Sequence, residues 1–108
     1  MPENIIEAVG FDWDDGNRGK CQQHGVPFDD IEAMFQRPVA VFPDPFHSRR
    51  EERFKAIGKN AVGRSVFVVF TLRTRNRETY IRPISARYMH RDEIGHYEKE
   101  EAAKTQKR

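Results

Sequence analysis

The segment SVFVVFTL at residues 65–72 constrains the fold more than any other stretch of the chain. It is apolar at successive positions, and a strand that is apolar on both faces lies in the interior of a sheet. Strand-like segments also occur at residues 39–42 (VAVF), 53–58 (RFKAIG) and 79–86 (TYIRPISA), with short polar connectors around the central one. These segments predict a sheet of about four antiparallel strands with residues 65–72 at its centre.

Pro83 lies inside the last of these strands. Because proline donates no backbone hydrogen bond, this strand is predicted either to lie at a sheet edge or to contain a β-bulge near Pro83. Arg82 and Arg87 are separated by an odd number of positions, so a regular strand would place them on opposite faces. One bulge would turn both side chains to the same face.

Helical patterns occur before and after these strands. A polar helix is predicted at residues 15–23, ended by Gly25, and a second has Asp29 in its first turn and ends at Pro38. A short strand is expected before them in VGFDW, and a final helix is expected to start near His90.

The expected architecture is therefore an α+β domain with two N-terminal helices, an antiparallel sheet and a C-terminal helix. We expect one domain over residues 1–98 and a charged tail over 99–108. One sheet face should meet the helices, and the other should stay partly open as a binding surface.

Composition limits the class of protein. The chain is 37% hydrophobic and 33% charged, which is polar for a folded domain but too apolar for disorder. Cys21 is the single cysteine, so no internal disulfide forms and a cytoplasmic location is expected. The start of the chain has neither a basic leader nor a long apolar stretch, and no membrane association is expected.

Charge is distributed unevenly along the sequence. Residues 1–48 hold three Lys/Arg and nine Asp/Glu, giving −6, whereas residues 49–97 hold twelve and five, giving +7. This asymmetry predicts that acidic and basic residues lie on different surfaces and that the basic one binds a polyanion. The alternative is that solvated charges are scattered over the whole surface.

Five motifs follow one another within residues 10–98: WDDGN, HGV, PDPFHS, EERF and IRPISAR. In this order they resemble the BrnT toxins of bacterial type II toxin-antitoxin systems. The resemblance implies a RelE-like fold and an endoribonuclease that cleaves mRNA and arrests translation without a cofactor. It also implies a ribbon-helix-helix antitoxin, BrnA, in a two-plus-two assembly that reaches operator DNA only through the antitoxin. A catalytically inactive binding module acting as a co-repressor is the alternative.

Cleavage of RNA without a metal ion uses the adjacent 2′-OH as nucleophile, so it needs a base, an acid and cations for the phosphate charge. Arginine suits the last task because its planar fork binds two oxygens and stays charged. The catalytic candidates lie at or near the junction of the last strand and helix, or could approach it: Arg82, Arg87, His90, Arg91, Tyr97 and Glu52. As alternatives, His90 caps the helix and Tyr97 packs in the core.

RNA-binding candidates are three further cations of the basic half, together with two residues that carry aromatic rings: Arg53, Lys55, Arg64, Trp13 and His47. Trp13 at a strand end is also a common core residue. No metal site is expected, because the Cys21–His24 and His90–His96 spacings differ from those of structural zinc sites.

Overall fold

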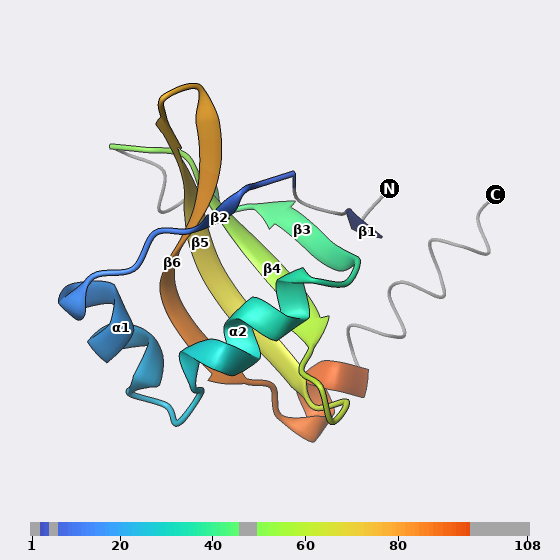
Figure 1. Ribbon diagram of the computed structural model, residues 1–108. Coiled ribbons are helices and arrows are strands. Elements are labelled where there is room, and N and C mark those ends of the chain that lie inside the picture. Colours follow the sequence, from blue (N-terminus) through green and yellow to red (C-terminus); the bar gives the residue numbers. More distant parts are fainter. Residues whose placement is uncertain (1–2, 5–6, 46–49, 96–108) are drawn as a thin grey trace, which may run out of the picture.

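The computed structural model describes residues 3–4, 7–45 and 50–95 of the 108-residue chain. Figure 1 shows its helices and strands. In chain order they are β1 (Glu3–Asn4), β2 (Gly10–Phe11), α1 (Asp15–Gln22), α2 (Phe28–Phe35), β3 (Val39–Pro43), β4 (Arg53–Lys59), β5 (Ser65–Arg75) and β6 (Glu78–Tyr88). A further helical segment occupies residues 91–95. The predicted α+β class is confirmed.

All the strands join one sheet in the order β1-β3-β4-β5-β6-β2. The strands β3 to β6 form the predicted antiparallel meander, and β5 lies inside the sheet between β4 and β6. The expectation of a purely antiparallel sheet is wrong, because β2 pairs with β6 in parallel. The short segment around β2 was predicted as a strand. Its pairing with β6 could not be predicted, because the two strands are far apart in the sequence and no local pattern indicates the partner.

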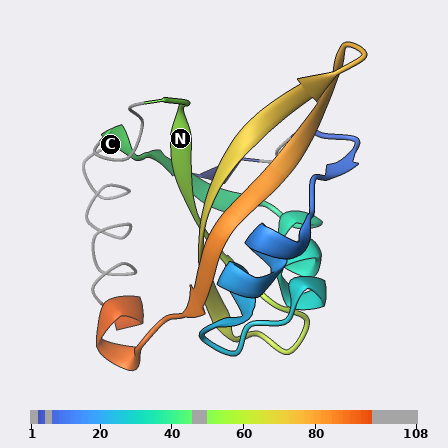
Figure 2. The same ribbon diagram turned by 90° about the vertical axis from the view of Figure 1, so that its left-hand side faces the viewer.

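Both complete helices cover the same face of the sheet. Figures 1 and 2 show α2 lying across the strands and α1 beside β6, whereas residues 91–95 lie on the opposite side. The apolar side of α2 packs on the sheet, and the rings of Phe35 and Phe70 meet edge to face at 5.3 Å between centroids. The core therefore lies between α2 and the strand residues that face it, such as Val66 and Val68, both fully buried.

Pro83 lies beside a β-bulge, which confirms one of the two predicted positions for this proline. Val69 pairs with Ser85 and Phe70 with Pro83, so Ile84 is an extra residue in β6. On the other side of β6, β2 pairs only as far as Ile81. Pro83 therefore stands just past the end of β2, where a backbone N–H is not needed for that ladder.

The polar connector expected after the central strand, RTRNRE at residues 73–78, is shorter in the structure. Both strands continue toward the tip, and the connection is only Asn76 and Arg77, which have positive φ angles of 52° and 67°. Two such residues form a type I′ turn, whose twist matches that of paired strands. The polar residues expected in a loop therefore belong to a hairpin that projects from the body (Figures 1 and 2).

No helix among the described residues is both long and apolar enough to cross a membrane. The predicted tail at 99–108 lies outside the described ranges. The helix expected near His90 does begin there, with its first helical residue at position 91.

Candidate active site

The bulge in β6 places Arg82 and Arg87 on the same face of the sheet. Arg82 pairs with Thr71 and Arg87 pairs with Phe67 on β5. Thr71 and Phe67 are four residues apart on a strand without a bulge between them, so their side chains point to the same face. Residues paired across two strands also share a face, so Arg82 and Arg87 point to that face as well. This face is opposite to the one that packs on α2.

The neighbouring strand β4 adds two cations to the same face. Arg53 pairs with Thr71, and Lys55 pairs with Val69. Arg53, Thr71 and Arg82 therefore form one row across three strands, with the outer two backbones roughly 10 Å apart. We call Arg53, Lys55, Arg82 and Arg87 the open-face cations.

Arg82 is held by carboxylates at the start of α1. Its Nη2 lies 2.8 Å from Asp14 Oδ2, and its Nη1 lies 3.6 Å from Asp12 Oδ1. Its side chain is only 18% exposed. The pKa of Asp14 is lowered, first by the backbone N–H of Asn17 that it accepts and then by the Arg82 guanidinium. The result is a guanidinium of fixed orientation at the edge of the open face.

Arg87 makes a two-point contact with Glu93 in the helical segment at residues 91–95. Its Nη1 and Nη2 donate to the two carboxylate oxygens at 2.7 and 2.8 Å. The guanidinium also lies 4.8 Å from the centroid of the Phe67 ring. Glu93 Oε1 in addition accepts the backbone N–H of His90 at 3.0 Å, the glutamate half of a capping box. Glu93 thus occupies the geometry that a phosphate would take.

The environment of Glu93 keeps its carboxylate ionised. Its pKa falls from the usual 4.5 to about 2, chiefly because Arg87 donates hydrogen bonds to it and then because His90 N–H does. The pKa of Arg87 rises for the same reason. Glu93 is therefore a poor proton donor, and its role is to hold Arg87.

Replacing Glu93 by glutamine is expected to lower Tm at neutral pH and to have less effect in acid. Because the folded pKa is depressed, the stabilising contribution is fully present above about pH 4.5 and is lost as the pH falls toward about 2. Thermal unfolding of both proteins over this range tests the expectation. A difference in Tm that stays constant down to pH 2 would show that charge is not the cause.

The remaining catalytic candidates differ in their surroundings. His90 is exposed and precedes the final helix, and Arg91 is exposed as its first residue. Glu52 is exposed, and its backbone carbonyl accepts a hydrogen bond from Thr71 Oγ1 at 2.6 Å. Tyr97 lies outside the described residues.

Of the RNA-binding candidates, Arg53 and Lys55 lie on the open face. Trp13 and Arg64 are turned toward the helices. Lys55 Nζ is 4.0 Å from Asp44 Oδ1. The Trp13 ring meets Phe28 edge to face, and its Nε1 donates to Glu32 on α2. The Arg64 guanidinium lies over the ring of Tyr88, which pairs with core-facing Val66. Trp13 and Arg64 are thus not brought together with the open-face cations, and His47 lies outside the described residues.

The expected separation of acidic and basic residues onto different surfaces is wrong around this site. Acids from the first half of the chain contact cations from the second: Asp12 with Arg75 and Arg82, Asp14 with Arg82, and Asp44 with Lys55. Folding brings the two halves together because β2 and α1 lie beside β6. The acids that orient the cations are the residues that sequence reasoning missed.

Asn17 is a further missed residue, and it connects α1 to the bulge. Its Nδ2 donates to Asp12 O at 2.9 Å and to Pro83 O at 2.8 Å. Its Oδ1 accepts the N–H of Asp14, which completes a capping box at the start of α1. The only signal in the sequence was its place within the WDDGN motif.

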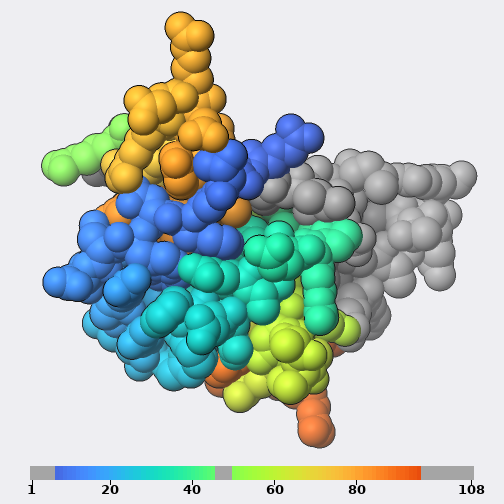
Figure 3. All heavy atoms as spheres, viewed as in Figure 1, coloured from blue at the N-terminus to red at the C-terminus, as the bar shows by residue number. Residues whose placement is uncertain are grey.

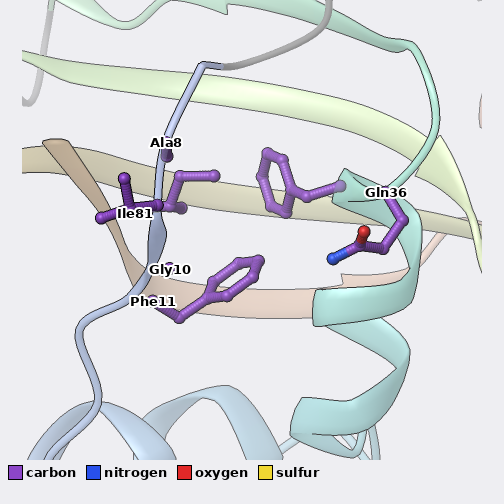
Figure 4. A pocket seen from close by; sticks show the side chains of 7 residues that line it. Ala8, Gly10, Phe11, Gln36 and Ile81 are labelled. Carbon is purple, nitrogen blue, oxygen red and sulfur yellow. The ribbon is translucent and has the colours of Figure 1, made fainter.

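Two other features lie away from the open face. A pocket of about 230 Å³ separates β2 from the end of α2, and its lining residues are uncharged: Ala8, Val9, Gly10, Phe11, Phe35, Gln36 and Ile81 (Figure 4). Cys21 is fully buried in the core, and burial raises the pKa of its thiol to about 11. Neither feature offers the positive charge that a phosphate site requires.

A comparison with protein families identifies a match to this chain. The family model described as ribonuclease toxin, BrnT, of type II toxin-antitoxin system matches residues 13–93. This range contains α1, α2, the sheet from β3 to β6 and Glu93. A search of curated proteins found no match.

Proposed function

The chain belongs to the BrnT family of ribonuclease toxins of type II toxin-antitoxin systems, and from this premise we propose that it is a metal-independent endoribonuclease that cleaves mRNA and arrests translation. One observation carries the assignment of the site: the bulge at Ile84 turns Arg82 and Arg87 to the open face, beside Arg53 across the sheet. A cleft between strands is not required, because an extended RNA strand can lie along a sheet face.

In the proposed reaction the 2′-oxygen of a ribose attacks the adjacent phosphorus. Its proton passes to a base, the bond from phosphorus to the 5′-oxygen breaks, and an acid protonates that oxygen. The products are a 2′,3′-cyclic phosphate and a 5′-hydroxyl end. Arg82 and Arg87 bind the phosphate and stabilise the negative charge that develops on its oxygens.

Proton transfer in this scheme is assigned to Glu52 or His90, with Tyr97 as a further candidate. Both described residues are exposed and lie at opposite ends of the open face, Glu52 before β4 and His90 after β6. Positioning of the substrate and arginine charge can supply a large part of the acceleration on their own. We therefore assign the arginines the larger contribution.

The substrate phosphate must compete with carboxylates for these arginines. Glu93 engages Arg87 through both terminal nitrogens, and Asp14 engages Arg82 through Nη2. Both carboxylates remain in contact with solvent, Asp14 at 55% exposure and Glu93 at 36%, and water screens their attraction to the guanidiniums, so exchange with a phosphate is feasible. The carboxylates keep the guanidiniums oriented until RNA binds.

Mapping of new RNA ends tests the proposal. Toxin purified free of antitoxin is incubated with mRNA in EDTA, and the 5′ ends and their chemistry are determined. New 5′-hydroxyl ends are expected. RNA that is shifted on a gel but not cut would support the alternative of a silent binding module, which the carboxylate pairing of both arginines favours.

The proposed partner is a BrnA-like ribbon-helix-helix antitoxin in the cytoplasm. Such antitoxins bind DNA as dimers, so two toxin copies on one dimer give a two-plus-two assembly, with operator DNA contacted only by the antitoxin. The open face combines cations with partly buried apolar residues, such as Phe67 and Val69. An antitoxin segment that is apolar and acidic would match this surface and exclude RNA from it.

Replacing Arg87 by glutamate is expected to weaken antitoxin binding and RNA cleavage together, each by at least ~10-fold. The change places a second acid beside Glu93 and removes a cation from the shared surface. Antitoxin affinity is measured at low and physiological salt, with Arg37→Glu at the end of α2 as the control. Unchanged antitoxin affinity at both salt concentrations would place neutralisation on another surface.

A further inference from the structure

The β5–β6 hairpin forms an exposed two-stranded ribbon beyond the body of the sheet. The ladder between β4 and β5 ends at Thr71, and every residue from 72 to 78 is exposed. Figure 3 shows the ribbon, in orange, standing clear of the packed body. Its sequence, LRTRNRET, contains three arginines, one acid and one large apolar residue. The ribbon, defined as residues 72–79, therefore carries charge but has no core of its own.

The turn at the tip places an arginine where glycine is strongly preferred. Type I′ turns require positive φ at both central residues, and the second is most often glycine. Here that residue is Arg77, with φ 67°. An L-residue with a long side chain is strained in this conformation, so the arginine costs stability at a fully solvent-facing turn, where its side chain is exposed. Such an outlier indicates a function for the side chain at the tip.

The ribbon is continuous with the candidate active site. Arg73 and Arg75 have the same parity on β5 as Thr71 and Phe67, so they share the face of the open-face cations. Asp12 joins the two regions directly: its Oδ2 lies 3.0 Å from Arg75, and its Oδ1 lies 3.6 Å from Arg82. The guanidiniums of Arg75 and Arg82 are thus neighbours on one carboxylate.

We propose that the ribbon is an RNA-binding arm that holds the phosphates of the strand flanking the cleavage site. The inference rests on the proposed function and extends it to a longer RNA footprint. Arg77 makes no ion pair with the described residues, whereas Arg73 makes an exposed one to Glu51 at 3.2 Å. Both are accessible to phosphate oxygens. Apart from Leu72, the ribbon lacks the apolar anchors on which protein interfaces depend.

The double variant Arg73→Gln/Arg77→Gly tests the arm without disturbing Asp12. Binding of long and short 2′-O-methyl RNA, which cannot be cut because the nucleophile is blocked, is followed by fluorescence anisotropy over a range of salt. For long RNA we expect about 10-fold weaker binding. The slope of log K against log[salt] should fall by about 1.4, which is two phosphate contacts in a single strand. Binding of the short RNA should be nearly unchanged.

A matched control removes two arginines from the helix side. Arg18 and Arg37 are exposed there, so Arg18→Gln/Arg37→Gln loses the same charge and is expected to retain the slope. Arg77→Gly alone should raise Tm by roughly 4 °C or more while weakening RNA binding, because glycine relieves the strained turn. A loss of binding in a more stable protein excludes unfolding as its cause.

Results for RNA binding and cleavage separate the two proposals. If the double variant keeps the wild-type RNA affinity and the wild-type slope of log K against log[salt], the ribbon is not an RNA-binding arm, even if RNA is still cut. If the variant binds RNA normally but binds the antitoxin poorly, the ribbon is a protein-docking surface and the inference is equally wrong. If RNA binding depends on the ribbon but the protein cuts no RNA, the proposal of an RNA-binding arm is supported and the proposed ribonuclease activity is wrong.

Discussion

Replacing Arg82 by alanine is expected to lower kcat/KM for RNA cleavage by about 100- to 1,000-fold, as removal of a donor to a developing oxyanion does in other enzymes. This corresponds to roughly 3–4 kcal/mol of lost transition-state stabilisation. The physical reason is its position: Asp12 and Asp14 orient the guanidinium at the end of a row that also contains Arg53. Growth arrest on expression should be relieved in parallel.

Lysine at position 82 is expected to restore only part of the activity. An ammonium keeps the charge but lacks the planar fork that contacts two oxygens at once. The same order, arginine above lysine above alanine, is expected at position 87, where the fork is already engaged by Glu93. A lysine variant as active as the wild type would mean that charge alone is needed.

Stability must be measured with activity, because Arg82 is not a freely exposed side chain. Asp12 is 8% exposed and contacts both Arg82 and Arg75. Without Arg82, Arg75 is the ion-pair partner that Asp12 keeps among the described residues. Arg37→Ala at the end of α2 is the control for loss of an exposed arginine. Alanine variants at 82 and 87 that fold normally and cleave RNA at the wild-type rate would show that these arginines do not bind the reacting phosphate.

Replacing Asn17 by alanine is expected to destabilise the fold by about 2–4 kcal/mol, a large part of the ~5–15 kcal/mol typical of such domains. Asn17 is 5% exposed and donates to two backbone carbonyls, those of Asp12 and Pro83. Alanine leaves both acceptors without this donor and also removes the acceptor of the capping box. A fall in Tm of roughly 10 °C or more should follow.

Two variants separate the hydrogen bonds of Asn17 from the helix itself. Asn17→Asp keeps the acceptor but places a carboxylate against two carbonyl oxygens, so it should be at least as destabilising. Gly19→Ala in the same helix, with open space around the added methyl group, should instead stabilise by about 0.5–1 kcal/mol. An Asn17→Ala protein with unchanged Tm would show that the contact with Pro83 does not hold α1 to β6.

Asn17 also connects stability to the site. Its bond to Pro83 O fixes the strand immediately before the extra residue Ile84, and that residue brings Arg82 and Arg87 to one face. A change at Asn17 is therefore expected to lower activity in the folded fraction as well as the amount of folded protein. Comparing cleavage per folded molecule with Tm distinguishes the two effects.

The sequence alone determined the elements whose signals are local. Apolar continuity identified β5 as an interior strand, and helix stop signals at Gly25 and Pro38 placed the ends of both helices. Pro83 reduced its strand to two cases, an edge or a bulge, because the missing N–H acts within the ladder itself. The grouping of arginines near the last strand could be recognised in the same way, from residues close together in the chain.

Only the tertiary structure decided which case holds and what surrounds the arginines. The pairing of β2 with β6, the bond from Asn17 to Pro83 and the contacts of Asp12 and Asp14 with Arg82 join residues more than sixty positions apart. Periodicity carries no information about such partners, since each depends on how the whole chain packs. The bulge converts an odd spacing into a shared face, so the candidate site exists because of packing around β6 rather than because of its sequence alone.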